Sequence, residues 1–210
     1  MARVLRKSYS GPGHARRVLG VAWCALLLAA CIFPGSVKPT VKIGLSAPFE
    51  GLYRALGYEA LYAVRLAVQQ RNQAGGLGGR YLVEFVALND FNEAGEAVVQ
   101  ARKMAVDAGV MGVLGGWSPE TARVSSAEYG RLGLAFLSPE GNLPQAQSSP
   151  PVGADFEAGY ETLSGGESPG PVAVWAYREA NRLLDAIEAT TRLEEQPTRR
   201  GVQEALAGNR

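Results

Sequence analysis

The chain has 210 residues, of which 47% are hydrophobic and 20% charged, and 21 basic side chains against 20 acidic ones leave a net charge of +1. This length suffices to bury one sizeable core, most simply as one domain. The chain has two cysteines and one histidine, which are too few for a disulfide framework or a typical Cys/His metal site.

The first 30 residues have the pattern of a secretory signal. Residues 1–17 carry five basic side chains and no acid, and residues 18–30 are mostly apolar but too few to span a membrane. The run closes with Leu-Ala-Ala-Cys at residues 28–31, which resembles the lipobox of bacterial lipoproteins and predicts lipidation of Cys31. An ordinary cleaved signal with a chance cysteine is the alternative.

Cleavage before Cys31 would change the chemistry that the chain can offer. The remaining 180 residues would hold 16 basic and 20 acidic side chains, a net charge of −4, without His14 and Cys24. Such a chain has no disulfide, no histidine general base and no Cys/His nucleophile pair. Its mild acidity also argues against nucleic-acid binding. We therefore expect that the chain is not an enzyme, has no catalytic residues and binds no cofactor or metal.

After a proline-containing tether at residues 31–40, strands and helices are expected to alternate. The strands are expected at residues 41–46, 81–88, 110–114 and 134–137. The helices are expected at about residues 57–72, 93–107 and 118–130, each with apolar side chains at helical spacing. This alternation predicts an α/β fold, a Rossmann-like three-layer parallel sheet with helices on both faces.

Two turns in this series carry further information. The glycine-rich residues 74–79 follow a helix and precede a strand, which indicates a helix stop and turn and is the reverse of a dinucleotide fingerprint. In contrast, Gly115 and Gly116 follow a buried strand, and Ser118 then has the properties of a helix cap. A strand that leads through glycines into a helix start is where open α/β sheets hold small anions.

The last third of the chain has a different character. Residues 143–153 are rich in proline and serine and are expected to form a linker or a surface loop. Beyond them, apolar spacing predicts helices over about 156–163 and 171–190 and a short final helix for which Thr198 is a plausible cap.

Short motifs occur in a fixed order between residues 41 and 139. They are the opening strand with its small-residue loop, N-x-A-G-G-x-G-G at residues 72–79, a strand followed by Gly-Gly, and G-L-A-F-L-S-P at residues 133–139. In this order they resemble the first lobe of the leucine/isoleucine/valine-binding family of type I periplasmic binding proteins. Residues 156–189 resemble that family's late helical segment, which returns to the first lobe.

The chain departs from this family in one respect. Family members have a second lobe inserted after the Ser-Pro strand, whereas here only residues 141–153 separate that strand from the late segment, too few for an α/β lobe. We therefore expect lobe 1 at residues 41–142, a linker at 143–153 in place of lobe 2, and a returning helical segment at 154–210. A single lobe would bind weakly or not at all without a partner surface, and its uncovered sheet edge favours aggregation or a homodimer.

The resemblance implies an extracytoplasmic solute-binding lipoprotein of an ABC-type importer. Its partners would be an amino acid or related small polar ligand, an ABC permease, and the membrane through its lipid anchor. Two alternatives remain, a sensory or interaction lobe and a non-functional deletion product. A surface hydrolase that uses the carboxylates is disfavoured, because the mature chain has no histidine and no G-x-S-x-G elbow.

Ligand contacts are expected from the loops after the first, third and fourth strands. The candidates are Tyr53, Trp117, Ser118, Thr121, Ser138, Glu140 and Asn142. The family holds its ligand with hydroxyls at two positions that align with Pro119, beside Ser118 and Thr121, and with Asn142. Glu140 stands where the family has an alanine-like residue, and its charge would repel an amino-acid carboxylate.

Other interpretations of these residues remain open. Ser118 also fits the role of a simple helix cap, and Trp117 fits half-exposed packing as well as a ligand wall. Glu50 and Asp90 are expected to be solvated loop acids, and Met104 is expected to be a core residue.

Overall fold

The computed structural model describes residues 38–139, 152–193 and 196–208. Within them the strands are β1 (Thr40–Ala47), β2 (Leu82–Asn89), β3 (Val110–Leu114) and β4 (Ala135–Leu137). The helices are α2 (Arg54–Gln73), α3 (Ala94–Val106), α4 (Pro119–Arg131), α5 (Ala154–Ser164), α6 (Pro171–Leu193) and α7 (Arg199–Gly208). Each lies where the sequence predicted it, although α2 begins three residues earlier than expected and α6 continues past Thr190.

The strands form one parallel sheet in the order β2-β1-β3-β4. All five residues of β3 are buried, as its uninterrupted apolar sequence predicts for a strand covered on both faces. The sheet therefore has β1 and β3 at its centre and β2 and β4 at its edges. The predicted α/β fold is confirmed.

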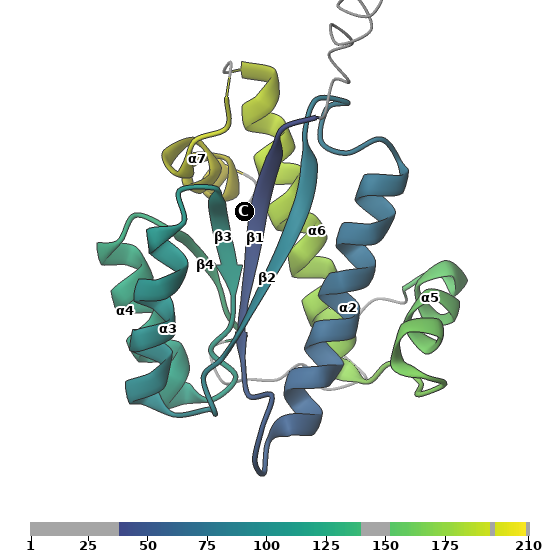
Figure 1. Cartoon of the computed structure of the whole chain (residues 1–210), viewed down its shortest axis with the longest axis vertical. Coiled ribbons are helices and arrows are strands. Elements are labelled where there is room, and N and C mark those ends of the chain that lie inside the picture. The colour runs from purple at the N-terminus through teal and green to yellow at the C-terminus, as the bar shows by residue number, and fades with distance from the viewer. Residues whose placement is uncertain (1–37, 140–151, 194–195, 209–210) are drawn as a thin grey trace, which may run out of the picture. The chain divides into compact units, whose positions relative to one another are not determined.

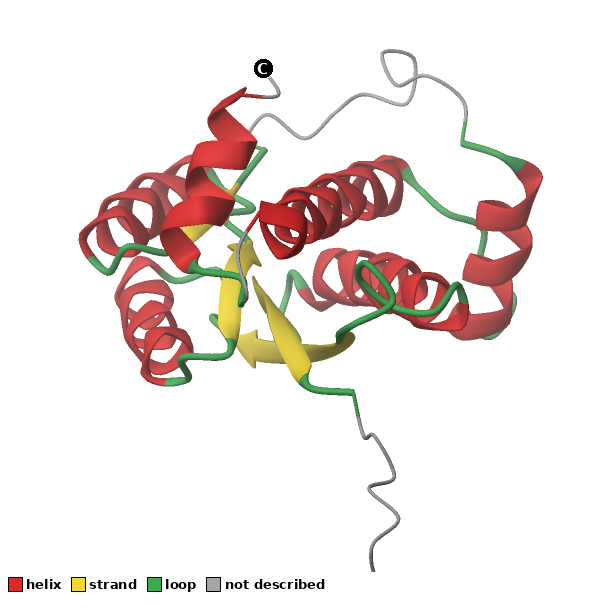
Figure 2. Cartoon of the chain, turned by 90° about the horizontal axis from the view of Figure 1, so that it is seen from above, coloured by secondary structure: helices red, strands yellow, loops and turns green. Residues whose placement is uncertain are grey.

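Helices cover both faces of the sheet (Figures 1 and 2). On one face α3 and α4 pack over a core that contains Met104 and Tyr129, so the expectation that Met104 is a core residue is confirmed. On the other face α2, α6 and α7 pack over the larger core, and α5 lies against α2. The carboxyl ends of all four strands meet at one edge of this three-layer arrangement.

The late helix α6 lies alongside α2 and is bonded to it at both ends. The carboxylate of Glu59 accepts a hydrogen bond of 3.0 Å from the amide of Ala173 in the first turn of α6. Burial raises the pKa of Glu59, and the bonds from the α6 amides act in the opposite direction. At the other end Arg71 forms ion pairs with Asp185 and Glu188. A carboxylate at a helix start and a cation near a helix end both complement the helix dipoles.

Arg199, at the start of the final helix, connects that helix to the end of α3 and the start of β3. Arg199 Nε donates to the carbonyl of Val110 at 2.9 Å, and Nη2 donates to the carbonyls of Ala105 at 3.1 Å and Asp107 at 2.6 Å. These three carbonyls belong to the end of α3 and the start of β3. The preceding residue, Thr198, accepts a hydrogen bond from the Gly201 amide, so the predicted helix cap is confirmed.

The glycine-rich segment after α2 forms the predicted turn. Gly75, Gly76, Gly78 and Gly79 all have positive φ angles, a conformation that other residues rarely adopt. A Cβ on Gly76 would lie 2.0 Å from the carbonyl oxygen of Tyr81. The interpretation of these glycines as a helix stop is therefore confirmed.

Candidate functional site

The predicted ligand site lies where the strands end and their loops begin. The loop after β1 leads into α2, the loop after β3 leads into α4, and β4 is followed by Ser138 and Pro139. Two hydrogen bonds join these segments: Trp117 Nε1 donates to the carbonyl of Ser46 at 2.8 Å, and Ser138 Oγ donates to the carbonyl of Gly116 at 3.1 Å. The structure thus places the loop after β3 against the end of β1 and beside Ser138, the first residue after β4.

Ser118 begins α4 with a reciprocal cap. Its Oγ accepts a hydrogen bond from the Thr121 amide at 3.3 Å, and Thr121 Oγ1 accepts one from the Ser118 amide at 3.1 Å. Pro119 occupies the first helical position, which needs no amide hydrogen. The cap interpretation of Ser118 is therefore confirmed. Thr121 is buried whereas Ser118 is partly exposed, so Ser118 is the hydroxyl of this pair that a solute could reach.

Gly116 permits the close contact between the loops of β3 and β4. Its φ angle is +74°, and a Cβ there would lie 2.6 Å from Ser138 Oγ and 2.7 Å from the Cα of Ala122. Any larger residue would therefore push Ser138 away from the start of α4. The glycine turn thus places Ser118 and Ser138 on neighbouring loops.

Trp117 is a packing residue in this structure. Only 4% of it is exposed, and its ring meets the ring of Trp175 edge to face with 5.4 Å between centroids. The expectation of half-exposed packing is wrong in degree, because Trp175 of α6 covers the indole from a distant part of the chain. The buried Trp117 ring therefore has little surface that a solute could contact.

Tyr53 has the opposite environment. It occupies the N-cap position of α2, makes no side-chain capping bond, and is 49% exposed. The preceding Leu52 is 89% exposed. These side chains leave an apolar surface at the same edge of the sheet as Ser118 and Ser138.

The loop after β2 also belongs to this edge, and the sequence did not indicate it. Thr121 Oγ1 lies 3.4 Å from Asn92 Oδ1. Asn92 and the neighbouring Phe91 have φ angles of +60° and +54°, which are uncommon for residues other than glycine. Strained residues of this kind often gather near functional sites, but no sequence pattern marks them here.

Asp90, at the start of that loop, is buried and not solvated. Its exposed fraction is 1%, Oδ2 accepts from Ser46 Oγ at 2.8 Å, and Oδ1 accepts from the Asn92 amide at 2.9 Å. The expectation of a solvated acid is wrong because Ser46 on the adjacent strand covers it. Glu50, in contrast, is exposed as expected. Burial raises the pKa of Asp90, and its hydrogen bonds act in the opposite direction.

This burial predicts a specific dependence of stability on pH. A carboxyl group with a raised pKa binds its proton more tightly in the folded state, so its contribution is present below its ordinary value of 3.8 and is lost as pH rises through the raised pKa. Urea unfolding at a series of pH values should therefore show the wild type losing stability relative to Asp90→Asn across that window. A difference that is constant with pH would contradict the prediction.

Asp107 provides a control of opposite sign. Its carboxylate accepts a hydrogen bond from Lys42 at 2.8 Å, and this bond lowers the pKa of Asp107. The wild type should accordingly gain stability relative to Asp107→Asn as pH rises through the lowered pKa toward the ordinary value. Opposite slopes for the two variants would show that the profiles report individual carboxylates.

Three candidate residues, Cys31, Glu140 and Asn142, lie outside the described residues. Among the residues that the structure does describe, no group of three or more His, Cys, Asp or Glu side chains could hold a metal ion. In the same parts of the chain, no helix combines the length and apolar character needed to cross a membrane.

Comparisons with known proteins agree with this architecture. Residues 40–150 match the family described as periplasmic binding protein. A leucine-, isoleucine-, valine-, threonine- and alanine-binding protein from Pseudomonas aeruginosa is 26% identical over 151 residues, which cover 72% of this chain and 39% of that protein. The chain therefore spans well under half the length of this relative.

Solved structures share the fold. A protein from Rhodospirillum rubrum, assigned as a branched-chain amino acid ABC transporter, superposes with a TM-score of 0.67 at 18% identity, over 80% of this chain and 89% of that one. The substrate binding protein LivJ of a branched-chain amino acid transporter from Streptococcus pneumoniae, in complex with isoleucine, gives 0.65 at 13% identity, over 80% and 88%. The resemblance found in the sequence is thus confirmed, and this chain belongs to the periplasmic binding protein family.

Proposed function

We propose that this chain is the ligand-contacting lobe of an extracytoplasmic solute-binding protein of an ABC-type importer, anchored by lipid at Cys31. The observation that carries the proposal is the family match over residues 40–150, which includes every strand and each loop at the candidate site. Its ligand would be an amino acid or a related small polar molecule. The ABC permease would receive that ligand.

Ser118, Ser138 and Tyr53 would supply the contacts. Pro119 has no amide hydrogen, and the amides of Thr121 and Ala122 donate to Ser118. The Glu120 amide and the Ser118 hydroxyl would therefore be the donors that meet a carboxylate at the positive end of the helix dipole. The Ser138 hydroxyl lies on the adjacent loop, and the exposed Tyr53 ring offers apolar surface. Glu140 and Asn142 would add a charge and an amide just beyond the end of β4.

The affinity of this surface would be low. Two-lobed binders gain affinity when a hinge closes and water leaves the ligand. The described edge supplies contacts from one side only, so we expect dissociation constants in the millimolar range, about −4 kcal/mol of binding free energy. A partner surface that covers the edge would raise that affinity.

Amide shifts in the labelled chain test this proposal. Titration with leucine, isoleucine, valine, threonine or alanine should shift the amides of Gly116, Ser118 and Ser138 with a millimolar midpoint. Ser118→Asp should abolish these shifts while the helix stays intact, because aspartate caps a helix as well as serine but repels a carboxylate.

Ser126→Asp is the matched control. It adds the same charge at an exposed position of α4 and should leave the titration unchanged. Absence of shifts at these amides for all five amino acids, with the chain folded, would contradict the proposal. Binding of the amino acids by Ser118→Asp with the same midpoint as the wild type would also contradict the proposal.

One observation favours an interaction lobe as the second candidate. Four large hydrophobic side chains, those of Leu52, Tyr53, Tyr58 and Phe91, are exposed in the loops after β1 and β2 and at the start of α2. Exposed apolar surface of this kind is typical of interaction sites. In that case the amide resonances of this edge would broaden as protein concentration rises, and they would not shift when the amino acids are added.

A further inference from the structure

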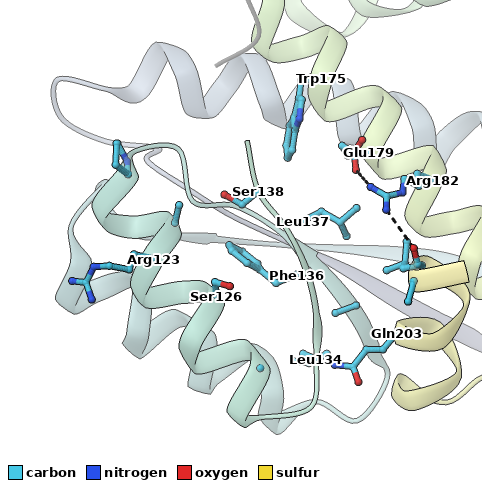
Figure 3. A pocket seen from close by; sticks show the side chains of 16 residues that line it. Arg123, Ser126, Leu134, Phe136, Leu137, Ser138, Trp175, Glu179, Arg182 and Gln203 are labelled. Carbon is cyan, nitrogen blue, oxygen red and sulfur yellow. Dashed lines mark hydrogen bonds and ion pairs between the residues drawn. The ribbon is translucent and has the colours of Figure 1, made fainter. Parts of the chain in front are cut away.

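A groove of about 930 Å³ runs along the open side of β4 and meets the candidate ligand site at Ser138 (Figure 3). Its floor is Leu134 to Ser138, and its walls are α4 on one side and α6 with α7 on the other. Among the residues that the structure describes, β4 pairs with β3 alone, so this floor is an edge of the described sheet. Edge strands present unpaired main-chain groups that can bind another strand.

The register of β4 shows which groups face the groove. The Gly115 amide of the β3 side donates to the Leu137 carbonyl at 3.1 Å, so the main-chain groups of Leu137 point toward β3. Main-chain directions alternate along a strand. The N–H and C=O of Phe136 therefore point into the groove, in position to pair with an added strand.

This edge is recessed between its walls. Ala135 is 5% and Leu137 6% exposed although the strand has a partner on one side only, because the flanking helices shield it. An equally recessed β4 of a second copy cannot reach the same depth. A single extended segment can, since neighbouring strands are only about 4.8 Å apart.

The charges around the groove select an uncharged occupant. Arg182 forms an ion pair of 3.0 Å with Glu179 and lies 3.4 Å from the Leu206 carbonyl, so its charge is already matched. Arg123 points away from β4 (Figure 3). Neither cation is placed to bind a phosphate or a carboxylate in the groove.

The two walls differ in size and polarity. On the α6 and α7 side, Trp175 and Leu206 offer large apolar side chains beside Gln203 and the paired Glu179 and Arg182, whereas Ala122, Ser126 and Gly130 on α4 are small. Successive side chains of an added strand face opposite walls. Alternation of apolar and small polar residues therefore matches the groove, as in other cases of strand addition.

We propose that the groove along β4 accepts an extended, uncharged polypeptide segment of a partner chain, which pairs with Phe136 as an additional strand of the sheet. This surface shares Ser138 with the candidate ligand site but includes neither Ser118 nor Tyr53, and the proposal does not require the solute proposed above.

A designed peptide tests this surface on the full chain in detergent micelles. The probe has alternating threonine and valine residues with one lysine at each end for solubility, and its binding is followed by fluorescence anisotropy. We expect saturable binding, with slowed hydrogen exchange at the Phe136 amide. The same peptide N-methylated at alternate residues, which cannot pair as a strand, should bind at least about ten-fold more weakly.

Two tryptophan substitutions on α4 locate the binding. Ser126→Trp fills the groove and should weaken binding of the peptide by about ten-fold. Ala127→Trp lies on the same helix but outside the lining and should leave the affinity for the peptide unchanged. Equal loss in both variants, no binding by a folded chain, or undiminished binding of the N-methylated peptide would overturn the proposal. Protection of Phe136 that grows with protein concentration alone would assign the groove to a second copy and overturn it as well.

Discussion

Replacing Arg199 with methionine is expected to lower the free energy of unfolding by about 3 kcal/mol. The substitution keeps the length of the side chain but removes its hydrogen bonds to the carbonyls of Ala105, Asp107 and Val110. All three carbonyls would lose the guanidinium donor where α7 covers the end of α3 and the start of β3, although the Asp107 carbonyl would keep its hydrogen bond from the Val110 amide. Urea unfolding followed by circular dichroism measures the effect, and we expect α7 to show faster hydrogen exchange than α2.

Arg200→Met is the matched control for this prediction. Arg200 is adjacent in sequence, highly exposed, and forms an ion pair with Glu204 one helical turn away, a type of pair that contributes little to stability. Its replacement should leave the unfolding curve nearly unchanged. Equal effects of the two substitutions would show that charge, and not the bonds to the carbonyls, accounts for the role of Arg199.

Gly57→Ala is expected to destabilise the chain by about 3 kcal/mol, although alanine is the better helix former. A Cβ at Gly57 would lie 1.8 Å from the carbonyl oxygen of Pro48. Relief requires movement of backbone, because Pro48 directly follows the buried residue Ala47 at the end of β1. The loop that carries Tyr53 would move with it, so the shifts in the solute titration should change together with the stability.

Gly95→Ala supplies a comparison of opposite sign. Gly95 lies in α3, and no atom is within 4 Å of the position that its Cβ would occupy. The substitution should be neutral or stabilising by up to about 1 kcal/mol. Thermal unfolding of both variants distinguishes the cases, and a stabilising Gly57→Ala would contradict the close approach of α2 to Pro48.

Local sequence patterns were sufficient for the order of the elements. Branched residues in short runs predicted the strands, and apolar residues at helical spacing predicted the helices, because each pattern depends on neighbours within a few positions. The cap at Ser118 and the turn at residues 74–79 were predicted for the same reason. Both depend on the chemistry of adjacent residues and form independently of the segments that pack around them.

Burial of individual polar and aromatic residues could not be predicted in this way. Asp90 follows a strand as solvated acids commonly do, and its burial depends on Ser46 from a strand far earlier in the chain. Trp117 is covered by Trp175 from α6. Arg199 and Arg200 are identical neighbours, and only the docking of α7 makes one of them a hydrogen-bond donor to three carbonyls while the other faces solvent.

The groove along β4 shows the same division between local and long-range effects. The residues of β4 predict a strand, but its position at an edge follows from the order β2-β1-β3-β4, to which distant segments contribute. Periodicity and turn chemistry act between neighbours in sequence and can be recognised there. Burial, strand order and the walls of a groove arise from contacts between residues far apart in the chain, so the folded structure was needed to establish them.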